Sequence, residues 1–160
     1  MELIPSFQID HTRLQPGIYV SRVDEVGGDF VTTFDLRMKR PNIDPTVSPA
    51  AMHTIEHLVA TCLRNDPAWR DRIVYFGPMG CLTGCYLLVK GRPTPEEILP
   101  PVKAAYEFCA AYEGDVPGAT PDGCGNWTLH DLAGAKTEAK RYADLLGADP
   151  CFVYPAGNRN

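Results

Sequence analysis

The residues best suited to chemistry in this 160-residue chain stand in the segment His53-Thr54-Ile55-Glu56-His57. On a helix, side chains four positions apart lie on the same face, so the imidazoles of His53 and His57 can reach one metal ion. Glu56 lies about 60° from His53 around such a helix. Two histidines and a free carboxylate at this spacing predict a metal centre with an acid or base beside it.

Two histidines do not complete a catalytic metal site, because such sites use three protein ligands. Cys81 and Cys124 are the candidates for the third ligand, since glycines stand close to both. Glycine lets the backbone turn tightly and lets a ligand approach closely. The spacing leaves both candidates open. The remaining cysteines are predicted to be packing residues: Cys62, Cys85, Cys109 and Cys151.

The helix that must carry the histidine motif is well marked in the sequence. Ser48 can cap it, Pro49 suits its first position, and Asn65-Asp66-Pro67 ends it. One side of this helix carries apolar residues at helical spacing: Ala51, Met52, Ile55, Leu58, Val59, Cys62 and Leu63.

Strands are predicted on both sides of this helix. Residues 17–38 are rich in β-branched and aromatic side chains around Gly27-Gly28, which predicts a hairpin. A second strand pair is predicted near residues 72–76 and 81–90. The order of elements favours an α+β fold, an antiparallel sheet with helices packed mainly on one face, in a single domain over residues 1–160.

Two further helices are predicted in the second half of the chain. The first spans about residues 94–112, and the adjacent Pro100 and Pro101 predict a kink or a restart within it. The second spans about residues 129–146 and ends at Gly147. His130 has no motif around it and is predicted to be an ordinary residue of the first turn of that helix.

Composition and charge exclude several classes of protein. The chain is 44% apolar and 22% charged, with 15 basic and 20 acidic residues and a formal net charge of −5. This balance argues against nucleic-acid binding, which uses a basic surface. No run approaches the ~18 apolar residues of a membrane helix, and residues 1–5 do not resemble a signal peptide. We therefore expect a cytoplasmic protein without disulfides or a membrane partner.

Five motifs in order resemble the S-ribosylhomocysteine lyase (LuxS) family, which makes the autoinducer-2 precursor. The resemblance covers nearly the whole chain, and five matches in order are far more specific than any single one. The motifs are Ser6-Phe7-x-x-Asp10-His11-Thr12, Phe34-Asp35-Leu36-Arg37, His53-Thr54-x-Glu56-His57, Met79-Gly80-Cys81-x-Thr83-Gly84 and Cys124-Gly125-Asn126.

The resemblance implies a role for each residue of the metal motif. His53, His57 and Cys124 match the family's metal ligands, with one divalent ion per subunit. Ferrous iron is implied as the native ion, with zinc or cobalt as substitutes. The fourth position of an open catalytic site is left for water or substrate. Glu56 and Cys81 match the general acid/base pair.

The resemblance also implies how substrate is held. Ser6, His11 and Arg37 match residues that bind S-ribosylhomocysteine. In the family they come from the neighbouring subunit of a homodimer, with the active sites at the subunit interface. A small-molecule substrate and a homodimer are therefore expected.

The implied reaction explains these residue types. The substrate joins ribose to homocysteine through a thioether, and the sulfur leaves only when a carbonyl lies β to it. The family moves the carbonyl from carbon 1 to carbon 3, which requires protons to be removed and returned. A thiolate at Cys81 and the carboxyl of Glu56 suit these transfers, and a divalent ion stabilises the developing oxyanion. The products are homocysteine and 4,5-dihydroxy-2,3-pentanedione.

The chain departs from the family pattern in two segments near the site. The family commonly has Asp and Ser before the Met79-Gly80-Cys81 motif, whereas residues 74–78 here are Val-Tyr-Phe-Gly-Pro. This departure places the pKa tuning of Cys81 in question. A second thiol, Cys85, stands where an aromatic residue is usual.

Two alternatives follow from the same residues. In a small metallopeptidase, Glu56 would activate a metal-bound water, and Glu113 or Glu138 would be the third ligand. In a non-catalytic, metal-stabilised module, Cys81 would be a fourth ligand that closes the site.

Overall fold

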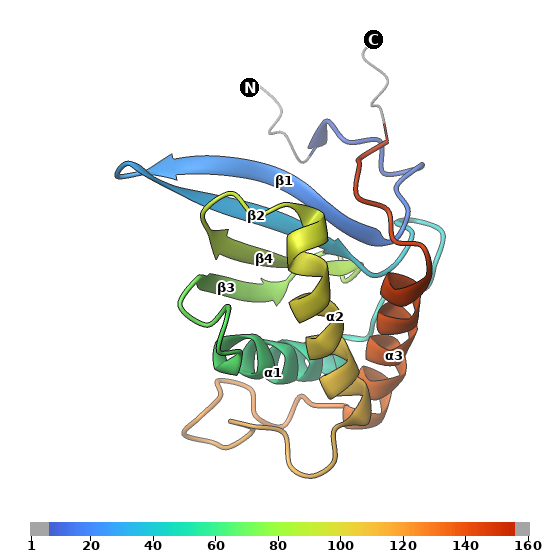
Figure 1. Ribbon diagram of the computed structural model, residues 1–160. Coiled ribbons are helices and arrows are strands. Elements are labelled where there is room, and N and C mark those ends of the chain that lie inside the picture. Colours follow the sequence, from blue (N-terminus) through green and yellow to red (C-terminus); the bar gives the residue numbers. More distant parts are fainter. Residues whose placement is uncertain (1–6, 156–160) are drawn as a thin grey trace.

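The computed structural model describes residues 7–155. Within this part of the chain, four strands form one antiparallel sheet in the order β1-β2-β4-β3. Figure 1 shows the helices together on one side of the sheet, as the sequence predicted. The elements are β1 (Gly17–Val26), β2 (Asp29–Arg37), α1 (Pro49–Asn65), β3 (Ile73–Pro78), β4 (Gly84–Lys90), α2 (Pro95–Ala111) and α3 (Leu132–Ala148).

The sheet register places the end of β2 beside the start of β4. Gly27 and Gly28 have φ of +61° and +87°, the left-handed values that a two-residue hairpin turn requires. Pairing then runs to Arg37, which lies opposite Gly84. Because the turn before Gly84 carries Cys81, the register brings Arg37 close to that thiol.

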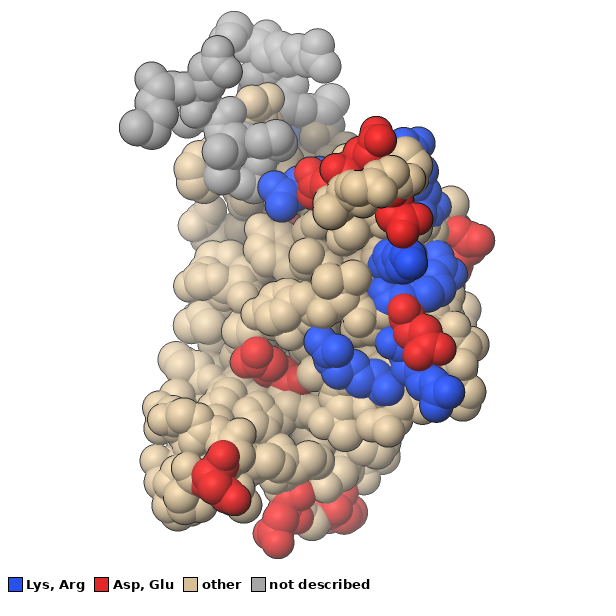
Figure 2. Space-filling view, turned by 90° about the vertical axis from the view of Figure 1, so that its left-hand side faces the viewer, with Lys and Arg blue, Asp and Glu red and all other residues tan. Residues whose placement is uncertain are grey.

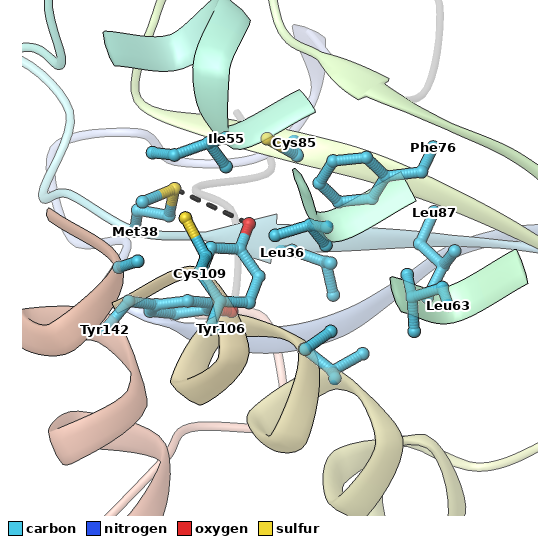
Figure 3. Packing of buried hydrophobic residues seen from close by; sticks show 14 of the residues in the cluster. Leu36, Met38, Ile55, Leu63, Phe76, Cys85, Leu87, Tyr106, Cys109 and Tyr142 are labelled. Atoms are coloured by element: carbon cyan, nitrogen blue, oxygen red, sulfur yellow. Dashed lines mark hydrogen bonds between the residues drawn. The ribbon is translucent and has the colours of Figure 1, made fainter. Parts of the chain in front are cut away.

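The helix α1 begins and ends where its sequence signals indicated. The Ser48 hydroxyl accepts a hydrogen bond from the Ala51 amide at 3.2 Å, and Pro49 is the first helical residue. Its apolar side packs on the sheet and on α2 and α3, as Figure 3 shows for Ile55 among Leu36, Cys85 and Tyr106. The opposite side of α1 is left for the histidine motif.

The predicted restart of the second helix is wrong. α2 runs through Pro100 and Pro101 without a break. Both prolines are near the helix start. They have no amide hydrogen to donate to the carbonyls of Glu96 and Glu97, but these two residues are exposed, so water can bind their carbonyls instead.

The predicted start of the last helix is also wrong. α3 begins at Leu132, where the Asp131 carboxylate accepts from the Gly134 amide at 2.9 Å, and it continues past Gly147 to Ala148. Leu129 and His130 therefore belong to the loop before α3. None of the helices in residues 7–155 is long and apolar enough to cross a membrane.

Candidate metal centre and thiol site

Four side chains of the types that bind metal ions converge beside the exposed side of α1. His53 and His57 come from α1, Cys124 from the loop after α2, and His130 from the residues before α3. Their ligand atoms all lie within 4.8 Å of one another. The Cys124 Sγ is 3.3 Å from the His53 Nε2. Imidazole nitrogen and thiolate sulfur are ligands that suit a divalent zinc, iron or cobalt ion.

Two backbone carbonyls fix the histidines for metal binding. The Nδ1 of His53 lies 2.8 Å from the Leu129 carbonyl, and the Nδ1 of His57 lies 2.7 Å from the Pro117 carbonyl. A carbonyl oxygen only accepts, so each Nδ1 must carry the proton. Nε2 is therefore the ring nitrogen that each histidine can offer to a cation. The residues present thus fit the divalent ion that the sequence implied.

His130 is the member of this cluster that the sequence analysis missed. Its ring stacks on His53 with centroids 4.2 Å apart and meets the edge of His57 at 4.8 Å. Its Nδ1 lies 3.1 Å from the Thr54 hydroxyl, and its Nε2 is buried without a hydrogen-bond partner among residues 7–155. Burial, and then the two neighbouring histidines, lower its pKa. The one available signal was that the chain holds only four histidines.

Glu56 shares a surface hollow with the two helical histidines. The hollow has a volume of about 480 Å³, and its lining includes Tyr75 and Phe76 of β3. Burial, and then the nearby Glu56 charge, raise the pKa of Tyr75. The departing segment 74–78 thus contributes a phenol to this hollow, which we call the metal hollow.

A second hollow, the thiol hollow, contains Cys81. It has a volume of about 310 Å³, and its lining includes His11, Arg37, Asp44, Cys81 and Thr83. The Cys81 Sγ is 3.1 Å from the Thr83 hydroxyl and 3.8 Å from the Arg37 Nη1. The Arg37 Nη1 also donates to the Thr83 hydroxyl at 2.6 Å.

These contacts favour the thiolate form of Cys81. Burial raises the pKa of the thiol, but the hydrogen bonds of Thr83 and the charge of Arg37 outweigh burial and lower that pKa. Arg37 is itself only 3% exposed and donates to the Asp35 carboxylate at 2.6 Å. Burial opposes the Arg37 charge, but Asp35 raises its pKa and keeps it protonated. Despite the departure at residues 74–78, the thiol has groups that tune it.

The structure divides the predicted site residues between the two hollows. His53, Glu56 and His57 line the metal hollow, and Cys124 joins the cluster at its edge. The thiol hollow holds the rest of the described set, which is Cys81, His11 and Arg37. Ser6 lies outside the described residues. Among the hollows lined by residues 7–155, Glu56 lines the metal hollow and Cys81 lines the thiol hollow.

Comparison with known proteins decides the family. The family model described as S-ribosylhomocysteinase (LuxS) matches residues 4–148. The chain belongs to the LuxS family. A protein of Phocaeicola vulgatus named S-ribosylhomocysteine lyase is 60% identical over 89% of this chain and 88% of its own. Two others with that name are 56% identical (Porphyromonas gingivalis, 89% of both chains) and 50% identical (Clostridium beijerinckii, 97% of this chain and 99% of its own).

Proposed function

We propose that this LuxS-family chain is an S-ribosylhomocysteine lyase that releases homocysteine and 4,5-dihydroxy-2,3-pentanedione, the autoinducer-2 precursor, by carbonyl migration and β-elimination. The observation that carries the proposal is the cluster of His53, His57 and Cys124 with Glu56 beside it. Relatives that bear this name are 50% to 60% identical over most of the chain.

His53, His57 and Cys124 would hold one divalent ion per subunit, ferrous iron in the native enzyme and zinc or cobalt as substitutes. When bound, the ion supplies a Lewis acid that stabilises negative charge on a substrate oxygen. Glu56 lies in the same hollow as the histidines, so its carboxyl exchanges protons with the sugar oxygens. The same group assists departure of the homocysteine sulfur.

Cys81 is the base that moves protons between carbons. As a thiolate it takes a proton from one sugar carbon and returns it to the next, so it is regenerated after each shift. Arg37 and Thr83 keep the pKa of the thiol low and thereby keep the thiolate available. His11 lines the same hollow and, with Ser6, is proposed to bind substrate.

The separation of the two hollows supports a homodimer. Catalysis needs Glu56 and Cys81 on one substrate, yet they line different hollows of one chain. We infer that the thiol hollow of one subunit faces the metal hollow of its partner. In Figure 2 most of the charged residues gather on the right-hand side of the view, and the left-hand side is largely tan. Trp127 and Leu129, beside Cys124, are exposed apolar residues that suit such an interface.

The structure gives less support to the two alternatives. A peptidase site would need Glu113 or Glu138 as third ligand, but these pair with Lys136 and Lys39, and Cys124 lies at the cluster instead. The alternative of a closed structural site was predicted with Cys81 as its fourth ligand, and Cys81 lies in the thiol hollow. A cytoplasmic location belongs to the proposal and is supported by six free cysteines.

Thiol release from S-ribosylhomocysteine tests the proposed activity. Protein purified without oxygen and loaded with ferrous iron should release homocysteine, and Cys81→Ala and Glu56→Ala should not. Metal-loaded wild-type protein that releases no thiol would overturn the proposal.

Mixing the two inactive variants tests the shared site. In a two-fold dimer, a Cys81→Ala subunit paired with a Glu56→Ala subunit has one intact site and one doubly altered site. An equal mixture whose subunits have been dissociated and allowed to re-pair at random should therefore recover about a quarter of wild-type activity. If each site used Glu56 and Cys81 of the same chain, the re-paired mixture would recover no activity. A site shared between subunits would then be excluded.

A further inference from the structure

A chain of buried polar groups connects the C-terminal segment to Cys81. The Tyr154 hydroxyl donates to the Asp35 Oδ2 at 3.0 Å. The Arg37 Nη2 donates to the same Oδ2 at 2.6 Å. The other guanidinium nitrogen of Arg37 contacts Thr83 at 2.6 Å and Cys81 at 3.8 Å. Two residues, Asp35 and Arg37, therefore connect Tyr154 to Cys81, the thiol that the proposed reaction uses.

Asp35 depends on Tyr154 because it has few other donors. Its side chain is 2% exposed, and its Oδ1 is buried without a partner among the described residues. The same oxygen, Oδ2, thus accepts from both Arg37 and Tyr154. A buried carboxylate requires compensation of its charge, and each charge-assisted hydrogen bond supplies a large share of it.

The segment that carries Tyr154 is held firmly against the sheet. The Tyr154 ring stacks on Tyr19 with centroids 4.6 Å apart and planes 8° apart. The Ile18 amide donates to the Cys151 carbonyl at 2.9 Å. A Cβ at Gly17 would lie 2.1 Å from that carbonyl oxygen, so only glycine permits this approach. Tyr154 lies beyond the residues that the LuxS family model matches.

We propose that Tyr154 is a positioning residue for Cys81, acting through Asp35 and Arg37. Its hydroxyl compensates part of the Asp35 charge and fixes the carboxylate, so the Arg37 guanidinium remains on Thr83 and the thiolate. Without the hydroxyl, less of the Asp35 charge is compensated. The carboxylate then attracts the Arg37 guanidinium more strongly, and its negative charge destabilises the Cys81 thiolate more. This inference rests on the proposed role of Cys81 as the carbon base.

Other titratable groups also face Cys81. His11 and Asp44 line the same hollow, and Tyr86 of β4 is close enough for the Cys81 charge to contribute to its raised pKa. All three are unchanged when Tyr154 is altered. A difference between variants in the titration of Cys81 therefore reports on the chain through Asp35.

The test is the pH dependence of Cys81 alkylation in the metal-loaded full-length protein. Iodoacetamide modification is followed from about pH 5 to 9, and fragment-ion mass spectrometry of the peptide that holds Cys81 and Cys85 separates the Cys81 thiol from the other five. Tyr154→Phe keeps the stacked ring and removes one oxygen. We expect its alkylation rate at pH 6.5 to fall about 2- to 3-fold, because the thiolate fraction falls as the thiol pKa rises.

Tyr19→Phe is the matched control. It removes the hydroxyl of the other ring in the stack, which donates to the Gln15 carbonyl at 2.7 Å and not to Asp35. Its profile should overlay that of the wild type. A Tyr154→Phe profile identical to wild type, or an equal shift in Tyr19→Phe, would overturn the inference.

The alkylation result is independent of lyase activity. If wild type releases no homocysteine but the Tyr154→Phe profile still shifts, the proposed reaction fails and the positioning of the thiol stands. If homocysteine is released and the profile does not shift, the proposed reaction stands and the role of Tyr154 is excluded.

Discussion

The metal hollow and the thiol hollow are built on opposite principles. In the metal hollow, side chains from a helix and a loop converge on one point, and two backbone carbonyls hold the histidines in an orientation that suits an ion. In the thiol hollow, each charged group already has its counterpart in the chain, since Asp35 pairs with Arg37 and Arg37 approaches Cys81. The first arrangement depends on an ion, and the second on the register of the sheet.

This difference predicts that mutations in the two hollows have different consequences. Loss of a ligand should remove the ion from the metal hollow and leave the thiol unaffected. Loss of a charge in the thiol hollow should affect folding as well as chemistry, because that charge is buried between strands.

The largest effect is expected from Cys124→Ala. The variant should lose the ion and at least about 10³-fold in homocysteine release, since two histidines hold divalent metals weakly. Metal content by elemental analysis checks the first expectation. Cys62→Ala, at a half-buried thiol on α1, should keep both ion and activity. A full ion complement in Cys124→Ala would contradict the ligand assignment.

Cys81→Ala should lose a similar factor in activity, about 10³-fold or more, and keep its ion. In wild type the thiol pKa is lowered, so the thiolate persists below the ordinary cysteine range. The pH–rate profile should thus stay flat on the acid side until the pH falls through that lowered pKa. Loss of metal from Cys81→Ala would show that the two hollows are not independent.

Arg37→Met should reduce both stability and thiolate content. It leaves the Asp35 carboxylate buried without its cation, which costs about 3–5 kcal/mol of unfolding free energy. Urea denaturation measures this loss. Lys140→Met, which breaks the exposed pair with Asp144, should change stability far less. Equal losses of unfolding free energy in Arg37→Met and Lys140→Met would contradict the expectation that the buried ion pair matters more than the exposed one.

His130→Ala should weaken the metal hollow without emptying it. We expect metal affinity to fall about 10- to 100-fold, the range for groups that support ligands, because His130 stacks on His53 and its Nε2 is buried at the cluster. Competition with a chromogenic chelator measures the affinity. His11→Ala removes a histidine of the thiol hollow and should leave it unchanged. Unchanged affinity in His130→Ala would exclude this role.

The smallest effect is expected from Gly77→Ala. A Cβ there would overlap the Tyr75 hydroxyl, so the Tyr75 side chain must move from its place in the lining of the metal hollow. We expect activity to fall about 3- to 10-fold, as a displaced group beside Glu56 would cause. Gly80→Ala, whose Cβ would meet nothing within 4 Å, should have a smaller effect. If Tyr75 carries the effect, Gly77→Ala adds no loss in a Tyr75→Ala background.

Local signals in the sequence predicted much of the fold. The Ser48 cap, the apolar side of α1 and Gly27-Gly28 act over a few residues, so the helix and the hairpin formed as expected. The wrong predictions concern segments whose conformation depends on the rest of the structure. Helix α2 accommodates Pro100 and Pro101 because they lie near its exposed start. His130 lies in the loop before α3 and not in the helix.

The same division holds for the site. The sequence by itself determined the pair His53 and His57, because helical periodicity places residues four apart on one face, and the motifs identified Cys81 and Cys124. Only the tertiary structure decided that His130 joins the cluster and that Tyr154 reaches Asp35 across 119 positions. Such contacts depend on how strands and loops pack, and no short-range pattern in a chain encodes them.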